Sequence, residues 1–97
     1  MKQKIVSENI GVTLTGGGTF DPVIPADKLI YMGISFVNTT GVDLFMKFSP
    51  TGTVSTIDAG DYWYNQAKEA KYPLGGQVYL NGTGTLVIEL QTLVLEQ

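Results

Sequence analysis

The sequence contains no cysteine, no histidine and no arginine. Without cysteine the chain can form no disulfide and has no thiolate to act as a nucleophile or a metal ligand. Without histidine it lacks the side chain that most often serves as a general base or a metal ligand near neutral pH. The composition therefore predicts a protein that is not an enzyme and that holds no cofactor and no metal.

Charged residues of either sign are also scarce. Only 15% of the residues are charged, and six basic against nine acidic side chains give a net charge of −3 at pH 7. The six basic residues are lysines that form no basic run, so the chain lacks the cationic patch that would release counterions from a nucleic acid. The missing arginine also removes the bidentate partner of phosphate and guanine. We therefore expect no nucleic-acid partner.

Long apolar runs are absent as well. No stretch approaches the roughly 20 apolar residues that a membrane-spanning helix needs. The N-terminal sequence MKQKIVSEN is not followed by the apolar run of about 7–15 residues that marks a secretory signal. We expect no membrane partner, synthesis in the cytoplasm and no export by the general secretion route.

The sequence does contain short runs of alternating apolar and polar residues, separated by turns rich in Gly, Pro, Asn and Asp. Side chains on a strand point alternately to two faces, so a period of two predicts strands with one buried face. We count about seven such strands in a single β domain over residues 1–97. The predicted fold class is all-β, an antiparallel β-sandwich or jelly-roll-like barrel. At most one short helical turn is expected, over residues 65–71 (NQAKEAK).

The clearest pattern lies in residues 29–48, which predict a β-hairpin with a three-residue loop at residues 39–41 that ends in Gly41. Apolar side chains occupy alternate positions on both strands: Ile30, Met32, Ile34 and Phe36 on the first, and Val42, Leu44, Met46 and Phe48 on the second. Such a loop would pair Phe36 with Leu44, Ile34 with Met46 and Met32 with Phe48 on one buried face. If Phe48 is buried there, its replacement by alanine should cost about 3–5 kcal/mol.

Two segments fall outside this regular pattern. Residues 1–9 could extend a strand predicted at residues 10–15, or form an N-terminal arm that packs on a neighbour. Residues 16–27 are a long Gly/Pro-rich loop with three consecutive glycines, which neither a helix nor a central strand tolerates. No Gly-Lys-Ser/Thr follows the glycines, so a phosphate-binding loop is not favoured.

Two apolar features are candidates for protein interfaces. The last strand, predicted at residues 85–95, has Val87, Leu93 and Leu95 on the face opposite Leu86, Ile88 and Leu90. A terminal strand that is apolar on both faces is either buried between two sheets or covered by another subunit. The second feature is the cluster Tyr62, Trp63 and Tyr64, for which alternation places the tyrosines on one face and the tryptophan on the other. It fits core packing, a subunit or partner interface, or stacking on a sugar or a base.

The acidic residues have two interpretations. Asp58 and Asp61 flank a glycine turn, and two nearby carboxylates could in principle serve a glycosidase. Aspartate also favours turns because its side chain bonds the local backbone, and this interpretation is preferred. The glycosylation acceptor patterns that begin at Asn38 and Asn81 are likewise interpreted as turns.

Taken together, four segments resemble small β-sandwich virion proteins of tailed bacteriophages, which include head decoration (cement) proteins and head-fibre types. They are a strand end with its loop (FVNTTG, 36–41), the next strand (VDLFMKF, 42–48), a corner (IDAGDYW, 57–63) and a closing hairpin (VYLNGTGTLVIE, 78–89). The resemblance covers about residues 29–91.

This resemblance implies a structural protein with no catalytic residues to carry over. It implies a homo-oligomer, commonly a homotrimer, that is made in the host cytoplasm and binds the capsid surface of a phage head. Its partners would be copies of itself and the major capsid protein or another virion protein. The alternative is a carbohydrate-binding module of a phage receptor-binding or tail-associated protein, with Tyr62, Trp63 or Tyr64 stacking on a sugar.

Overall fold

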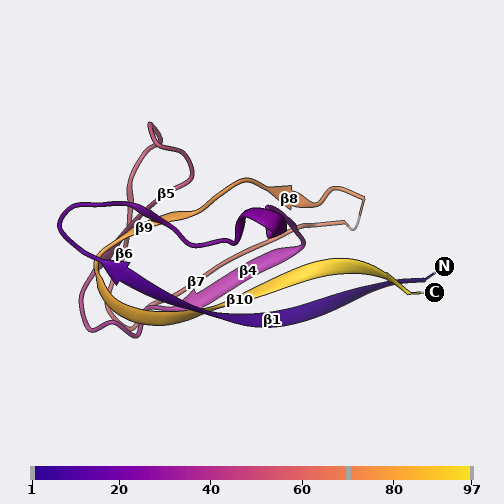
Figure 1. The fold of residues 1–97 in the computed structure, drawn as a ribbon, viewed down its shortest axis with the longest axis horizontal. Helices are drawn as coiled ribbons and strands as arrows, with labels where there is room; N and C mark the ends of the chain where they lie inside the picture. Colours follow the sequence, from indigo (N-terminus) through magenta and orange to yellow (C-terminus); the bar gives the residue numbers. More distant parts are fainter. Residues whose placement is uncertain (1, 70, 97) are drawn as a thin grey trace.

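A computed structural model describes residues 2–69 and 71–96 and shows an almost purely β structure (Figure 1). The elements, in chain order, are β1 (Lys2–Thr15), β2 (Asp21–Pro22), the 3-10 turn η1 (Ala26–Lys28), β3 (Ile30–Tyr31), β4 (Gly33–Val37), β5 (Leu44–Lys47), β6 (Ser55–Ile57), β7 (Tyr62–Gln66), β8 (Leu74–Gly75), β9 (Tyr79–Asn81) and β10 (Thr83–Glu96). The predicted all-β class is confirmed.

The strands form two four-stranded antiparallel sheets. Sheet A has the order β1-β10-β4-β7 and sheet B the order β2-β9-β5-β6, while β3 and β8 make a separate short pair. Successive strands of the sandwich lie in opposite sheets, with the single exception of β5 and β6, which are neighbours in sheet B. This strand order is that of the jelly roll, in which two Greek keys build a two-layered sandwich.

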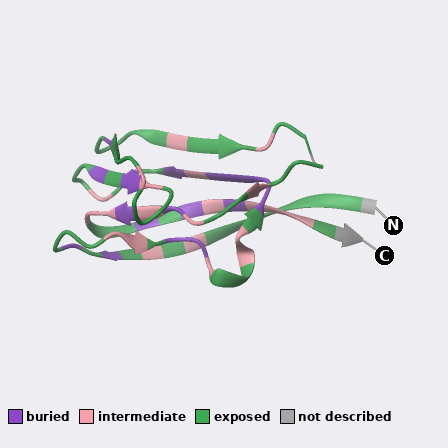
Figure 2. Ribbon diagram, turned by 90° about the horizontal axis from the view of Figure 1, so that it is seen from above, coloured by how far each residue is buried: buried purple, intermediate pink, exposed green. Residues whose placement is uncertain are grey.

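The core lies between the two sheets, and every strand of the sandwich except the edge strands β2 and β7 buries an apolar side chain in it. Figure 2 shows the buried residues gathered in the sandwich, whereas residues 3–6 of β1 and 92–94 of β10, in the projecting part, are exposed or intermediate. The buried cluster contains Leu14, Val23, Ile24, Tyr31, Ile34, Phe36, Leu44, Met46, Ile57, Val78, Leu80, Leu86, Ile88 and Leu90. Alternation along β10 therefore identifies its buried face correctly.

The predicted hairpin over residues 29–48 is wrong, although five of its eight predicted buried side chains are right. The five that are buried are Met32, Ile34, Phe36, Leu44 and Met46. However, β4 pairs with β10 and β7 in sheet A, and β5 pairs with β6 and β9 in sheet B. Gly41 has the expected positive φ of 84°, but the loop carries the chain into the facing sheet. Alternation identifies which face of a strand is buried. Two strands in facing sheets show the same alternation as two neighbouring strands of one sheet, so alternation does not identify which strands pair.

The buried face also ends earlier than predicted. Ile30 is 73% exposed, Val42 42% and Phe48 53%. Phe48 therefore lies outside the core, and an expected cost of about 3–5 kcal/mol for Phe48→Ala does not apply to a half-exposed ring.

The predicted helical turn at residues 65–71 is also wrong. Asn65 and Gln66 are the last residues of β7, opposite Ile34 and Gly33 of β4, and none of residues 67–69 and 71 is helical. Pairing with β4 outweighs the intrinsic helix propensity of this short segment. The one helical turn in the described residues is η1, which lies near the end of the Gly/Pro-rich loop of residues 16–27.

β1 and β10 form a ribbon that projects from the sandwich. They pair along their whole length, from Lys2↔Glu96 to Thr15↔Thr83, whereas β10 pairs with β4 only as far as Gln91. About five residues of each strand therefore lie beyond the sheet, a length of about 16 Å. Both chain ends lie at the tip of this ribbon (Figure 1). Residues 2–9 form the outer part of β1, and residues 2–6 face β10 residues 92–96.

Candidate functional site

The outer face of sheet A carries two exposed tyrosines. Tyr64 lies opposite Ser35 and Tyr62 opposite Val37, so both project from the edge strand β7 away from the core. Their side chains are 64% and 61% exposed, and their rings stack with centroids 5.6 Å apart and an interplanar angle of 24°. The two rings therefore contact each other and still remain largely exposed to solvent.

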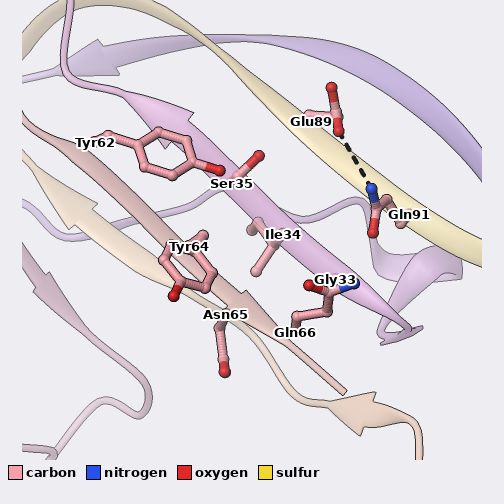
Figure 3. A pocket seen from close by; sticks show the side chains of 9 residues that line it. All are labelled: Gly33, Ile34, Ser35, Tyr62, Tyr64, Asn65, Gln66, Glu89 and Gln91. Carbon is pink, nitrogen blue, oxygen red and sulfur yellow. Dashed lines mark hydrogen bonds between the residues drawn. The ribbon is translucent and has the colours of Figure 1, made fainter. Parts of the chain in front are cut away.

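A shallow hollow separates these tyrosines from β10. Its floor is the small residues Gly33 and Ser35 of the central strand β4, and its far wall is Glu89 and Gln91 of β10. Gln91 Nε2 donates to Glu89 Oε1 at 3.4 Å. In Figure 3, Tyr62 points across β4 toward Ser35, while Asn65 points away from the hollow. The hollow has a volume of about 80 Å³.

Glycine lets the Gln91 side chain lie over the floor of this hollow. A Cβ atom on Gly33 would lie 2.8 Å from Oε1 of Gln91, so a larger residue there would displace the amide from its position over β4. Alternation indicates that Glu89 and Gln91 face outward, since they alternate with the buried Ile88 and Leu90. It does not indicate that they lie across β4 from the tyrosines, because that depends on the pairing of three strands distant in sequence.

Trp63 lies on the opposite face from the two tyrosines. Its ring centroid is 5.6 Å from that of Phe36 and 6.0 Å from that of Phe48. The tryptophan is half-buried against the core and joins β7 of sheet A to the end of β5 in sheet B. The aromatic cluster is therefore divided between two faces, and the geometry favours packing rather than sugar stacking for Trp63.

The projecting ribbon is apolar on both faces. Ile5 lies opposite the half-buried Leu93 on the outer face. Val6 and Val94 lie on the other face, which continues the buried face of β10. Ile5, Val6 and Val94 are all exposed. The side chain of Leu95 lies outside the described residues.

Two further hollows adjoin apolar residues of sheet A. One of about 180 Å³ at the base of the ribbon is lined by Ile30, Tyr31, Met32, Pro73 and Leu93. The other, a broad depression of about 400 Å³, lies beside the exposed Val87, where Gly11 of β1 leaves open space opposite it. Leu93 and Val87, both predicted as interface residues, thus lie on the outer face of sheet A.

An ion pair and a buried phenol lie near the base of the ribbon. Lys28 Nζ of η1 lies 2.9 Å from Glu8 Oε1 of β1, and this hydrogen bond raises the pKa of Lys28 above its ordinary value. Burial raises the pKa of the Tyr31 phenol, whose hydroxyl donates to the Gly76 carbonyl at 3.2 Å. Both contacts hold the segment around β3 against its neighbours.

The acidic residues behave as turn residues. Asp21 accepts hydrogen bonds from the Thr15 amide at 3.1 Å and hydroxyl at 3.0 Å. The exposed Asp58 and Asp61 are joined through their backbones, Asp61 N to Asp58 O at 3.0 Å, in the turn between β6 and β7. Among the described residues, no group of three or more acidic, histidine or cysteine side chains is placed to hold a metal ion.

This chain shares its fold with a solved structure, although its sequence has no match. The sequence matches no protein-family model, and no curated protein is significantly similar to it. A solved structure from the work "Bacillus endospore appendages form a novel family of disulfide-linked pili" superposes with a TM-score of 0.62 over 98% of this chain and 93% of that chain. The two sequences are 14% identical, so the likeness concerns the fold. The present chain has no cysteine with which to form a disulfide.

No helix in the described residues is long and apolar enough to cross a membrane.

Proposed function

We propose that this protein is a structural subunit that associates with copies of itself through the projecting ribbon of β1 and β10. The observation that carries this proposal is that exposed apolar side chains lie on both faces of the ribbon beyond the sandwich. An isolated pair of strands is marginally stable in water, and exposed Ile5, Val6 and Val94 add unfavourable hydration. A partner that covers the ribbon would stabilise it.

A second copy of the chain is the partner that best fits this surface. Symmetric homo-oligomers are the commonest assemblies of soluble proteins, and the low charge of the chain limits repulsion between copies. A twofold dimer would use one ribbon face, whereas a closed ring gives each subunit two different neighbours. A ribbon with two apolar faces therefore favours a ring, of which the trimer is the smallest.

We also propose a location for this assembly. The resemblance to phage decoration proteins supports the outer surface of a phage head, with the major capsid protein or another virion protein as partner. The jelly roll shared with a pilus protein supports only the coarser idea of a self-assembling structural protein.

Analytical ultracentrifugation tests the self-association. Wild-type protein at about 50 µM should sediment as an oligomer, and the Ile5→Thr/Leu93→Thr variant should sediment as a monomer. Threonine keeps the β-propensity of the ribbon and removes its apolar surface. The control Val42→Thr/Val54→Thr changes two exposed valines far from the ribbon and should leave the oligomer intact. A monomeric wild type would refute the proposal.

The proposed location needs a separate test. Density-gradient fractionation of lysed, phage-producing cells should place the protein in the fraction that contains filled heads. Recovery only at the top of the gradient would refute the capsid location and leave the self-association to be judged by its own experiment.

A further inference from the structure

We infer that the outer face of sheet A binds a neutral oligosaccharide. The proposed site, called the tyrosine trough below, consists of Gly33, Ser35, Tyr62, Tyr64, Gln66, Glu89 and Gln91. This function goes beyond self-association and uses a different part of the surface from the ribbon.

The two aromatic rings of the trough are arranged to receive a sugar ring. Tyr62 and Tyr64 are the exposed aromatic pair of sheet A, and their mutual stacking holds both rings upright at the edge of the trough. The axial C–H groups of a hexopyranose form an apolar patch that fits flat against an aromatic face. Two side-chain torsions per tyrosine mean that little conformational entropy is lost on binding.

Several polar groups around the trough have unused hydrogen-bonding capacity. The hydroxyls of Ser35, Tyr62 and Tyr64 and the amide of Gln66 make no side-chain hydrogen bond with any described residue. Glu89 and Gln91 share one bond, which leaves a carboxylate oxygen and the amide oxygen of Gln91 as free acceptors. A sugar carries a donor and an acceptor on nearly every carbon. Hydrogen bonds from its hydroxyls to a carboxylate are the stronger, charge-assisted kind.

The small size of the hollow indicates how the ligand would lie on it. Pockets that enclose a small molecule usually measure about 300–1,000 Å³. A hollow of about 80 Å³ admits only the edge of one sugar ring. The ligand must therefore lie mostly on the surface, which fits a chain of several sugars crossing the strands better than a monosaccharide. Repetition of the trough in an oligomer would raise the avidity for a polysaccharide.

The charge of the site favours a neutral ligand. Glu89 lies in the wall of the trough, no lysine lines it, and the chain has no arginine. An acidic sugar or a nucleic acid would bring negative charge close to this carboxylate without a cation to offset it. The polar lining also distinguishes the trough from the apolar ribbon, so a second copy of the chain is the less suitable occupant.

Titration of the wild-type oligomer, followed by NMR or calorimetry, tests the proposal. The probes are hexasaccharides of β-1,4-glucose, α-1,4-glucose, β-1,4-xylose, β-1,4-mannose and β-1,4-N-acetylglucosamine, with hexagalacturonate as the acidic comparator. At least one neutral probe should bind with a dissociation constant below about 1 mM, and hexagalacturonate should bind at least about tenfold more weakly. Absence of binding to every neutral probe at about 5 mM would overturn the proposal.

Two variants of trough residues locate the binding. Tyr64→Ala and Glu89→Gln should each weaken it by about tenfold, through loss of ring stacking and of a charge-assisted acceptor respectively. Tyr72→Ala is the matched control, because Tyr72 is equally exposed and lies outside the trough, so its affinity should equal that of the wild type. Unchanged affinity in both trough variants would overturn the assignment. So would dissociation of the oligomer by Tyr62→Ala/Tyr64→Ala, because the face would then be a subunit contact.

Discussion

Asn38 is the buried polar residue that holds the corner between the two sheets. It is 1% exposed, and its Nδ2 donates to the carbonyls of Val42 at 2.8 Å and Ile57 at 3.0 Å. Its Oδ1 accepts from the Thr40 hydroxyl at 2.7 Å and the Thr40 amide at 3.2 Å. One side chain thus joins the β4–β5 loop to the end of β6. Its burial supports a structural role for this asparagine over glycosylation.

The Asn38→Ala variant should lose about 2–4 kcal/mol of unfolding free energy. The cost arises because the Ile57 carbonyl loses its side-chain donor in a buried site, and because the part-buried hydrogen bonds to Val42 and Thr40 are lost with it. Chemical denaturation measures the loss. Asn9→Ala is the control, since Asn9 is exposed on β1 and makes no side-chain hydrogen bond with a described residue, so it should change stability by less than about 0.5 kcal/mol. A loss below about 1 kcal/mol for Asn38→Ala would contradict the corner role.

Tyr31 should make stability depend on pH above 10. Burial raises the pKa of its phenol above the ordinary value of 10.0, so the folded chain holds this proton more tightly than the unfolded chain. Stability is therefore unaffected by this group below pH 10 and falls as the pH rises through the folded pKa. The raised pKa of Lys28 acts in the same direction above 10.5.

Comparison of wild type with Tyr31→Phe isolates the contribution of the phenol. At pH 7 the variant should lose about 0.5–1.5 kcal/mol, because the hydrogen bond to Gly76 is removed. Between pH 10 and 11.5 the difference should shrink, since only the wild type must ionise a buried phenol. Thermal unfolding across this range measures the effect, and parallel stability curves for the two proteins would contradict it.

At the scale of the elements, Gly82 makes the tight passage from β9 in sheet B to β10 in sheet A. A Cβ atom there would overlap Cδ2 of Leu44, which is fully buried. Gly82→Ala should therefore cost about 1–3 kcal/mol through overpacking. Gly11→Ala is the matched control, because a Cβ on Gly11 meets nothing within 4 Å, and its stability should equal or slightly exceed that of the wild type. Equal denaturation midpoints for the two variants would contradict this account of the corner.

Sheet-to-sheet corners such as the one at Gly82 explain why the sequence predicts where strands lie better than it predicts which strands pair. Leu86, Ile88 and Leu90 alternate, and the structure buries all three. The passage at Gly82 resembles a hairpin turn in sequence, yet its two strands belong to different sheets. A hairpin turn and a sheet-to-sheet corner both need short polar residues and glycine, so local chemistry does not separate them.

The tyrosine trough was only partly predictable for a similar reason. Alternation correctly separates Tyr62 and Tyr64 from Trp63 and indicates an outward direction for Glu89 and Gln91. The position of Gly33 and Ser35 between them depends on β4 pairing with both β7 and β10. These pairings join residues at least 25 positions apart, and no local signal specifies them.

On the scale of the whole molecule, stability should be distributed unevenly. The sandwich has a continuous core, whereas the ribbon beyond Gln91 rests on a single strand pair with apolar side chains on both faces. Cooperative units with few buried contacts open at low free energy. Assembly would stabilise the ribbon specifically, because binding adds free energy only to the parts that contact the partner.

Native-state hydrogen exchange resolves this difference between ribbon and sandwich. In the monomeric Ile5→Thr/Leu93→Thr variant, backbone amides of residues 3–6 and 92–94 should exchange within about tenfold of the unfolded rate, whereas those of Ile88 and Leu90 should exchange slowest. In the wild-type oligomer the ribbon amides should slow by at least about a hundredfold, which corresponds to about 2.7 kcal/mol, while core amides at Ile88 and Leu90 change little. If the ribbon amides of the monomeric variant were as protected as those of the core, the ribbon would need no partner, and its two apolar faces would no longer support self-association.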